Sequence, residues 1–269
     1  MEKNSFESVM YEYTEWPGDL IPFNDLHFIS HRYNKVLSLC DSKDILEIGV
    51  GSSIAKKEMV NLSKSYTGID ISEKNISRLL KECESLNLSL YVDNAESMQF
   101  EDNSFDLVIA MAMVYYLDTE KFLSEVKRVL RPGGILFFCT SNVDVPGFHP
   151  APRSKTYLTI GKWNEILRQY NFSPEFEGVF PHKSIIKLGL RAKIISYIKS
   201  FIVDTLGLNH LWKRARELSK GSLATIPKNL NDFPEFKEVI LEGNQDLNNQ
   251  VINSLSLIFL FKSYSKRNH

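Results

Sequence analysis

The chain has 269 residues, a formal net charge of −1, 43% hydrophobic residues and 24% charged residues. The length suits one large α/β domain or a domain with an insertion, and the composition is typical of a soluble globular protein. The net charge argues against a basic nucleic-acid-binding protein. The amino-terminal residues lack the apolar stretch of a secretory signal, and the longest strongly apolar run, residues 257–261, is too short to span a bilayer. Three widely spaced cysteines form no disulfide framework, which favours a cytoplasmic location.

Residues 1–43 are rich in aromatic side chains, and we expect them to form a helical cap at one edge of the fold. Beyond them, short apolar segments alternate with helix-like segments, which predicts βαβ units and a parallel sheet. The clearest helix is 119–130, where apolar residues recur on one face until Pro132 and two glycines end it. Ligands of such sheets bind at the carboxyl ends of the strands. The predicted strands are residues 45–48, 66–70, 88–92, 105–111 and 135–139.

The second half of the chain is predicted to complete the sheet and to add a lid. Residues 159–170 have the spacing of an amphipathic helix, and a strand is expected near 174–180. We therefore place the core at residues 44–180 and its closing strand within 251–269. Residues 181–250 form an expected helical insertion over the active face, and its first half is rich in lysine and arginine. That basic half is interpreted as a solvated face, as a lid for an anionic substrate or as a membrane-surface helix.

The first predicted strand contains an acid, Glu47, and is followed by two glycines, Gly49 and Gly51. Glycine permits a sharp turn and close approach to a ligand, whereas an acid at this place would repel a pyrophosphate. The GxxxxGK[ST] pattern of a phosphate-binding loop is absent, and Ile54 stands where a dinucleotide-binding loop has its third glycine. The pattern favours a cationic ligand without phosphate, such as S-adenosylmethionine (SAM), which carries a sulfonium and an ammonium group.

Five segments between residues 45 and 141 resemble the class I SAM-dependent methyltransferases, of the small-molecule kind often called type 11. The segments are Glu47-Ile48-Gly49-Val50-Gly51, Asp70 at the end of YTGID, Asn94-Ala95-Glu96, Phe105-Asp106-Leu107-Val108, and VKRVLRPGGILFF. The resemblance implies a doubly wound, Rossmann-like α/β fold with a seven-stranded, mostly parallel sheet and an antiparallel closing strand at one edge. It also implies SAM as cofactor and S-adenosylhomocysteine as product.

The resemblance further implies which residues contact the cofactor. Asp70 is expected to hold the ribose hydroxyls, Asn94-Ala95-Glu96 the adenine, and Ile71 the apolar side of the adenine. Ser53 replaces a third glycine of the family, and we expect its hydroxyl to bond the cofactor tail; Asn94 replaces an aspartate, but its amide can still contact the adenine edge. The predicted cofactor-binding residues are Glu47, Gly49, Gly51, Ser53, Asp70, Ile71, Asn94, Ala95, Glu96, Ala110 and Met111.

The acceptor site is predicted from polar and aromatic residues near the same edge of the sheet. Many relatives have a histidine after the fourth strand, where this chain has Tyr115 and Tyr116. His149, in the loop after the fifth strand, and Tyr116 are the candidate catalytic bases for a hydroxyl acceptor. His27 and His31 have the i, i+4 spacing of a metal pair, but the sequence offers no third ligand and we expect no metal. The predicted substrate-binding residues are Tyr115, Tyr116, His31 and Tyr33.

These observations predict an enzyme that transfers a methyl group from SAM to a small molecule. We expect O-methylation of a carbohydrate or polysaccharide precursor, of a phosphorylated molecule, or of a natural product. Two alternatives stay open: a quinone or lipid methyltransferase at the membrane surface, and a non-catalytic methyltransferase-fold subunit that binds a partner. We expect no nucleic-acid partner and no integral membrane segment. The protein is expected to be a monomer or a homodimer. An anionic acceptor and a weak association with the membrane surface stay open.

Overall fold

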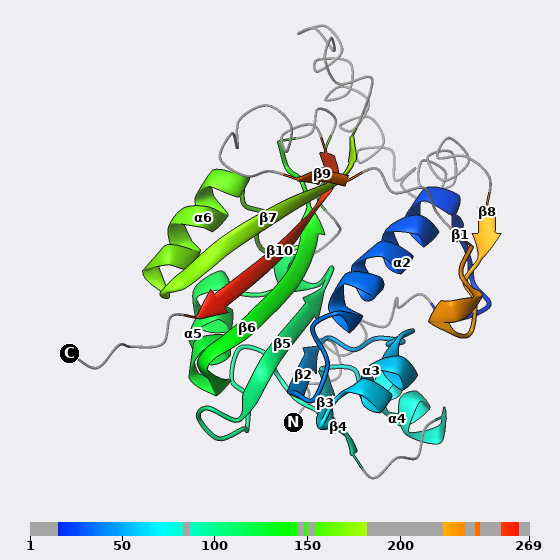
Figure 1. The fold of residues 1–269 in the computed structure, drawn as a ribbon, viewed down its shortest axis with the longest axis horizontal. Helices are drawn as coiled ribbons and strands as arrows, with labels where there is room; N and C mark the ends of the chain where they lie inside the picture. The colour runs from blue at the N-terminus through cyan, green and yellow to red at the C-terminus, as the bar shows by residue number, and fades with distance from the viewer. Residues whose placement is uncertain are drawn as a thin grey trace, which may run out of the picture.

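The computed structural model in Figure 1 describes the sheet and the helices that cover it. The described residues are 16–82, 87–144, 148, 150, 154–181, 223–234, 240–242 and 254–263.

Eight strands within the described residues form one mixed sheet in the order β4-β3-β2-β5-β6-β10-β7-β9. The pairs from β4 to β6 are all parallel, whereas β10 is antiparallel to both of its neighbours and β9 is antiparallel to β7. The predicted mostly parallel α/β fold is therefore confirmed. The strands are β2 (Asp44–Ile48), β3 (Ser65–Asp70), β4 (Leu88–Val92), β5 (Phe105–Met111), β6 (Leu130–Ser141), β7 (Phe172–Pro181), β9 (Ile240–Glu242) and β10 (Ser254–Ser263).

The closing strand, β10, is antiparallel as expected, but its predicted place at an edge of the sheet is wrong. Residues 256–262 pair with β6 on one side, and residues 254–263 pair with β7 on the other. A strand in this position satisfies the backbone of two neighbours at once, because each neighbour contributes a complementary row of N–H and C=O groups. The short strand β9 lies beside β7 and adds an eighth strand to the predicted seven.

Helices cover both faces of the sheet, as a doubly wound fold requires (Figure 1). One hydrophobic core lies under α2, α3 and α4, and a second lies under α5 and α6. Among the residues that the structure describes, no helix is long and apolar enough to cross a membrane. The helices are α2 (Phe23–Leu37), α3 (Lys56–Leu62), α4 (Glu73–Glu82), α5 (Thr119–Val129) and α6 (Ile160–Gln169), with 3₁₀ turns η2 (Val114–Tyr116) and η4 (Leu230–Asp232).

Helices α5 and α6 begin where the sequence predicts them because each has a side-chain cap. Asp118 accepts a hydrogen bond from the backbone N–H of Lys121 at the start of α5, and Thr159 accepts one from Lys162 at the start of α6. The predicted apolar face of α5 is buried against the sheet, including Phe122.

The predicted cap and the predicted insertion meet in a two-stranded ribbon. Strand β1 (Leu20–Pro22) precedes α2 and pairs antiparallel with β8 (Leu223–Thr225) from the insertion. The described parts of residues 181–250 consist of the end of β7, β8, η4 and β9, while the basic first half lies outside the described residues. The proposed domain boundaries stay a prediction.

Candidate functional site

A glycine turn follows β2 at the carboxyl edge of the sheet. Gly49 and Gly51 have φ angles of +68° and +51°, in the left-handed region that glycine enters without steric cost. The N–H groups of Gly49 and Val50 both donate to the carbonyl of Ile69 at the end of β3. A Cβ atom at Gly49 would lie 3.0 Å from Cγ of Met113. Backbone conformation and close packing therefore both require glycine at position 49.

Glu47, in β2, is almost fully buried beneath this turn. Its Oε2 accepts hydrogen bonds from the Tyr66 hydroxyl and, at 2.8 Å, from the Ser53 hydroxyl. Burial raises the pKa of Glu47, and the two hydroxyl donors and the charges of Arg32 and Lys56 oppose that rise. The network holds one oxygen of a buried carboxylate in place under the glycine turn.

Ser53 has a φ angle of +39° and occupies the position where the family usually has a third glycine. Its side chain is 3% exposed, and its hydroxyl lies 2.8 Å from Glu47 and 3.0 Å from the Tyr66 hydroxyl. The structure therefore gives this hydroxyl protein partners inside the molecule. A contact with a cofactor tail stays a prediction.

Helix α2 brings Arg32 and Tyr33 to this network. The guanidinium of Arg32 lies 5.4 Å from the ring centroid of Phe28 and 5.5 Å from that of Tyr33. Tyr33 is 4% exposed, and burial and the nearby Glu47 carboxylate raise the pKa of its hydroxyl. Tyr33 thus contributes to the buried wall of the site, which leaves its predicted contact with substrate as a prediction.

Asp70 ends β3 and ties the glycine turn to its neighbour strand. Oδ2 accepts from the N–H of Gly51 at 2.9 Å and from Nδ2 of Asn75 at 3.3 Å, while Oδ1 accepts from the N–H of Ser72 at 2.8 Å. Burial raises the pKa of Asp70, and these hydrogen bonds counteract the rise. The next side chain, Ile71, is 38% exposed. A buried acid bonded to the glycine turn therefore precedes an accessible apolar side chain.

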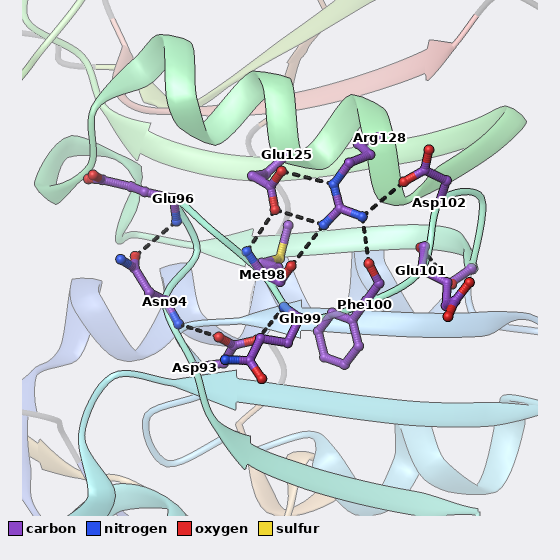
Figure 2. A network of polar contacts seen from close by, with 11 residues as sticks. Asp93, Asn94, Glu96, Met98, Gln99, Phe100, Glu101, Asp102, Glu125 and Arg128 are labelled. Atoms are coloured by element: carbon purple, nitrogen blue, oxygen red, sulfur yellow. Dashed lines mark hydrogen bonds and ion pairs between the residues drawn. The ribbon is translucent and has the colours of Figure 1, made fainter.

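The loop after β4 carries the predicted adenine contacts (Figure 2). Asn94 Oδ1 accepts from the N–H of Glu96 at 2.9 Å, which closes a tight turn around the buried Ala95. Oε1 of Glu96 accepts from the N–H of Asp118 and from Nζ of Lys155, both at 2.8 Å. The three residues are thus brought together in one rigid turn, with the Glu96 carboxylate bonded to other parts of the protein.

Strand β5 ends with Ala110 and Met111, both of them buried. The following residue, Ala112, has a φ angle of +52°, and its N–H donates to the carbonyl of Cys139 in β6. This turn brings the side chain of Met113 over Gly49. Met113 therefore makes the side-chain contact with the glycine turn, while the predicted contact of Ala110 and Met111 with the cofactor stays a prediction.

An aromatic cluster lies next to the end of β5. The rings of Tyr115 and Tyr157 stack at 4.8 Å, Tyr116 lies 4.6 Å from Tyr115, and Phe148 meets Tyr157 edge-on at 4.8 Å. The backbone N–H of Lys155 also donates to the carbonyl of Tyr115 at 2.8 Å. Two of the predicted acceptor residues, Tyr115 and Tyr116, are thus brought together, and the segment after β6 completes the cluster.

His31 lies elsewhere on α2, in a hydrogen-bonded contact with β7. Its Nε2 is 2.8 Å from Oε1 of Glu177, and Nζ of Lys35 is 2.6 Å from Oε2 of the same carboxylate. Burial alone would raise the pKa of Glu177, but these two hydrogen bonds hold it below its ordinary value. His149 lies outside the described residues. No group of metal ligands occurs among the residues for which the structure gives a placement.

Sequence reasoning missed several residues of this site. Tyr66 could have been found, because Tyr66, Gly68 and Asp70 alternate along one strand and so share a face with the predicted ribose acid. No local pattern in the sequence marks Met113 or Lys155, which reach the site from a turn and from the segment after β6.

The comparisons with known proteins agree with this geometry. Residues 46–138 match the family described as "Methyltransferase domain". The ubiquinone biosynthesis O-methyltransferase of Bartonella tribocorum is 22% identical over 79% of this chain and 77% of its own length. The protein of the same name from Pelagibacter ubique is 26% identical over 61% of this chain and 73% of its own length.

Solved structures show the same fold. A SAM-dependent methyltransferase from Thermotoga maritima is similar with a TM-score of 0.53 and 14% identity, over 89% of this chain and 91% of that one. A SAM-dependent methyltransferase from Mesorhizobium loti has a TM-score of 0.51 and 14% identity, over 85% and 96%. Because residues 46–138 match the methyltransferase domain and include the strands that carry the glycine turn, this chain contains a SAM-dependent methyltransferase domain with the fold of those solved structures.

Proposed function

We propose that this enzyme transfers a methyl group to an oxygen of a small aromatic acceptor. The acceptor is a quinone precursor, and the oxygen belongs to one of its ring hydroxyl groups. The similar proteins named ubiquinone biosynthesis O-methyltransferase support an oxygen acceptor in quinone synthesis. The structural observation that carries the proposal is the aromatic cluster of Tyr115, Tyr116, Tyr157 and Phe148. Aromatic side chains favour a flat ring, because offset or edge-on ring contacts add to the burial of apolar surface.

The residues at the edge of the sheet fit SAM. Gly49 and Gly51 leave room for its amino-acid tail, and the buried carboxylate of Glu47 supplies negative charge for its cationic groups. Ile71 offers an exposed apolar surface for the adenine, beside the turn that contains Asn94. In this arrangement the positive charge of the cofactor faces a carboxylate and its ring faces an apolar side chain.

Asp70 has room for one ribose hydroxyl. A carboxylate offers about four acceptor positions, and three are used by Gly51, Asn75 and Ser72. A ribose hydroxyl would donate to the remaining position. The same carboxylate would then join the glycine turn, the start of α4 and the cofactor.

When SAM is bound, it supplies a methyl group on a positively charged sulfur, which an acceptor oxygen displaces in line. Charge decreases as this step proceeds, so the main task of the protein is to align the acceptor and to exclude water. The aromatic cluster would hold the acceptor ring against the end of β5. Tyr116 in this cluster and His149 remain the proposed bases for the hydroxyl proton. The relatives described above do not support the predicted carbohydrate acceptor, and phosphorylated and natural-product acceptors stay predictions.

The experiment measures S-adenosylhomocysteine release by the full chain. We expect turnover with a dihydroxyphenol that carries a short isoprenoid chain, and none when both ring hydroxyls are replaced by hydrogen. Sugar nucleotides are the comparison acceptors. Tyr157→Leu should raise KM for the phenol about tenfold through loss of the stacked ring, whereas Tyr170→Leu, at the end of α6, should not. Turnover of the sugar nucleotides without turnover of the phenol would reject the proposal.

A further inference from the structure

Two ion-paired side chains of α5 hold the loop between β4 and β5 (Figure 2). The guanidinium of Arg128 donates from Nε to Oε1 of Glu125 at 2.9 Å and from one terminal nitrogen to Oε2 at 2.8 Å. This two-point pairing fixes the plane of the guanidinium, because both groups are planar and meet along two parallel bonds. The Glu125 hydrogen bonds from Arg128 lower the pKa of Glu125 against the opposing effect of burial, so the pair is charged at neutral pH.

Glu125 and Arg128 together bond both polar groups of the Met98 backbone, the N–H and the carbonyl. Oε2 of Glu125 accepts from the Met98 N–H at 2.7 Å, and Arg128 donates to the Met98 carbonyl at 2.9 Å. The other terminal nitrogen of Arg128 donates to the carbonyl of Phe100 at 2.5 Å and to Oδ1 of Asp102 at 3.0 Å. One arginine therefore holds three residues of a loop that contains no helix and no paired strand.

The amino-terminal end of this loop has a separate anchor. Asp93 accepts from the N–H of Asn94 at 2.8 Å through Oδ1 and from the N–H of Gln99 at 3.1 Å through Oδ2. Only Met98 lies between the Gln99 anchor and Ser97, which forms a bridge with Asn94. The turn that includes Asn94 is thus fixed at Asp93 on its amino-terminal side and at Met98 on its carboxyl-terminal side. Freeing Met98 would remove the anchor on that side and leave the turn held by Asp93 and by the Glu96 contacts with Asp118 and Lys155.

We propose that Arg128 and Glu125 are positioning residues for the adenine of SAM. This inference rests on the proposed placement of adenine against Asn94, Ala95 and Glu96. The pair makes no contact with the cofactor; it holds Met98 so that the backbone and amide groups of the turn face the adenine edge. An arginine suits this position because its planar guanidinium reaches five acceptors from three nitrogens. A lysine offers three donors from one nitrogen and cannot reproduce the two-point pairing with Glu125.

Arg131 provides a matched control three residues away. Its guanidinium is paired with Asp44 and Asp106, both at 2.8 Å, near the amino ends of the strands and so at the opposite edge of the sheet from the glycine turn. Arg128 and Arg131 have similar exposure, 29% and 37% of the side chain. Arg131→Gln therefore removes a comparable ion pair without touching the loop.

The test compares two ligands by calorimetry: S-adenosylhomocysteine and S-inosylhomocysteine, in which an oxo group replaces the adenine amino group. We expect Arg128→Gln to raise Kd for the adenine ligand about tenfold, as for loss of one charge-assisted hydrogen bond, and to reduce its preference over the inosine ligand. Arg128→Lys should have a partial effect, and Arg131→Gln should leave both affinities unchanged. Circular dichroism checks that each variant is folded at the working temperature.

Three results would overturn the inference, and each has a different meaning. Unchanged affinity in a folded Arg128→Gln variant would remove the positioning role alone. Equal losses in Arg128→Gln and Arg131→Gln would assign the effect to general stability. A wild-type protein that binds the adenine and inosine ligands equally would reject the placement of adenine on this turn, while leaving SAM binding and the aromatic acceptor proposal standing.

Discussion

Glu47 combines its proposed place at the cofactor with a cost in stability. It is 1% exposed, and burial raises the pKa of its carboxyl above the ordinary value of 4.5. Between that value and the raised native pKa, the folded state binds the proton more tightly than the unfolded chain does. The free energy of unfolding therefore falls as pH rises through this window, and the full cost is present above it.

Glu47→Gln should remove this titration and weaken cofactor binding at the same time. We expect the loss of stability between pH 5 and pH 8 to be smaller in the variant than in the wild type, because the amide carries no charge to bury. Urea unfolding at the two pH values measures the difference. The pKa of Asp70 is also raised, and this residue contributes equally to the pH dependence of stability in the variant and in the wild type. Identical pH dependence in both would show that Glu47 is not the titrating group.

Substitutions at Ser53 test whether the backbone of the glycine turn is strained at this position. Alanine and glycine at position 53 both lose the hydroxyl that bonds Glu47, but only glycine adopts a φ of +39° without steric cost. Ser53→Gly should therefore be more stable than Ser53→Ala by about 1 kcal/mol, the reverse of the usual order. Thermal unfolding of the two variants measures this difference, and equal midpoints would contradict it.

For single residues of the candidate site, the sequence indicates which residue types are present better than which side chains they bond. The acid and glycines of the first motif can be placed from their order along a strand. The Ser53 hydroxyl looked available to a ligand, because the sequence does not reveal that Tyr66 and Glu47 lie within hydrogen-bonding distance of it.

The strands β2, β3 and β6 are joined at their amino ends by one carboxylate. Asp44 accepts from Ser65 Oγ at 2.7 Å, from Lys64 Nζ at 3.0 Å and from Arg131 at 2.8 Å. Burial alone would raise the pKa of Asp44, but these hydrogen bonds lower it to about 2. A lowered native pKa stabilises the fold above the unfolded value of 3.8, and this stabilisation is lost as pH falls toward 2.

Asp44→Asn should lower the free energy of unfolding by about 2 kcal/mol at neutral pH, the value that follows from this pKa difference. The gap between variant and wild type should shrink steadily as the pH falls below 4. Urea unfolding across the acid range gives the measurement. Asp41→Asn, at an exposed neighbouring position, is the control and should change stability by less than about 0.5 kcal/mol.

Elements with a strong periodic pattern were predictable, and short elements were not. The apolar face of α5 and the continuous apolar strands β2 and β5 follow from local sequence, since burial sets their periodicity. Strands β1, β8 and β9 have three residues each, too few to show alternation. The apolar run in β10 indicated a strand, but an apolar run does not specify which two neighbours it pairs with.

In the whole molecule, β10 joins β7 to the rest of the sheet. Phe259 pairs with Phe138 of β6 and with Phe176 of β7. Phe259→Pro should lower stability by about 3 kcal/mol or more, because proline lacks an N–H and is excluded from central strands. Urea unfolding checks this. Leu241→Pro in the edge strand β9 is the comparison and should cost less; an unchanged midpoint for Phe259→Pro would contradict the central position of β10.

The ribbon of β1 and β8 has a consequence for biosynthesis. Ile21 pairs with Ala224, and the N–H of Gly18 donates to the carbonyl of Ile226, so partners about 200 residues apart must meet. At a translation rate of about 5–20 residues per second, β1 leaves the ribosome roughly 10–40 s before β8 exists. The segment ahead of α2 must remain unpaired throughout that interval. The ribbon that precedes α2 therefore forms only after the central parallel strands, which come before β8 in the chain, have been synthesised.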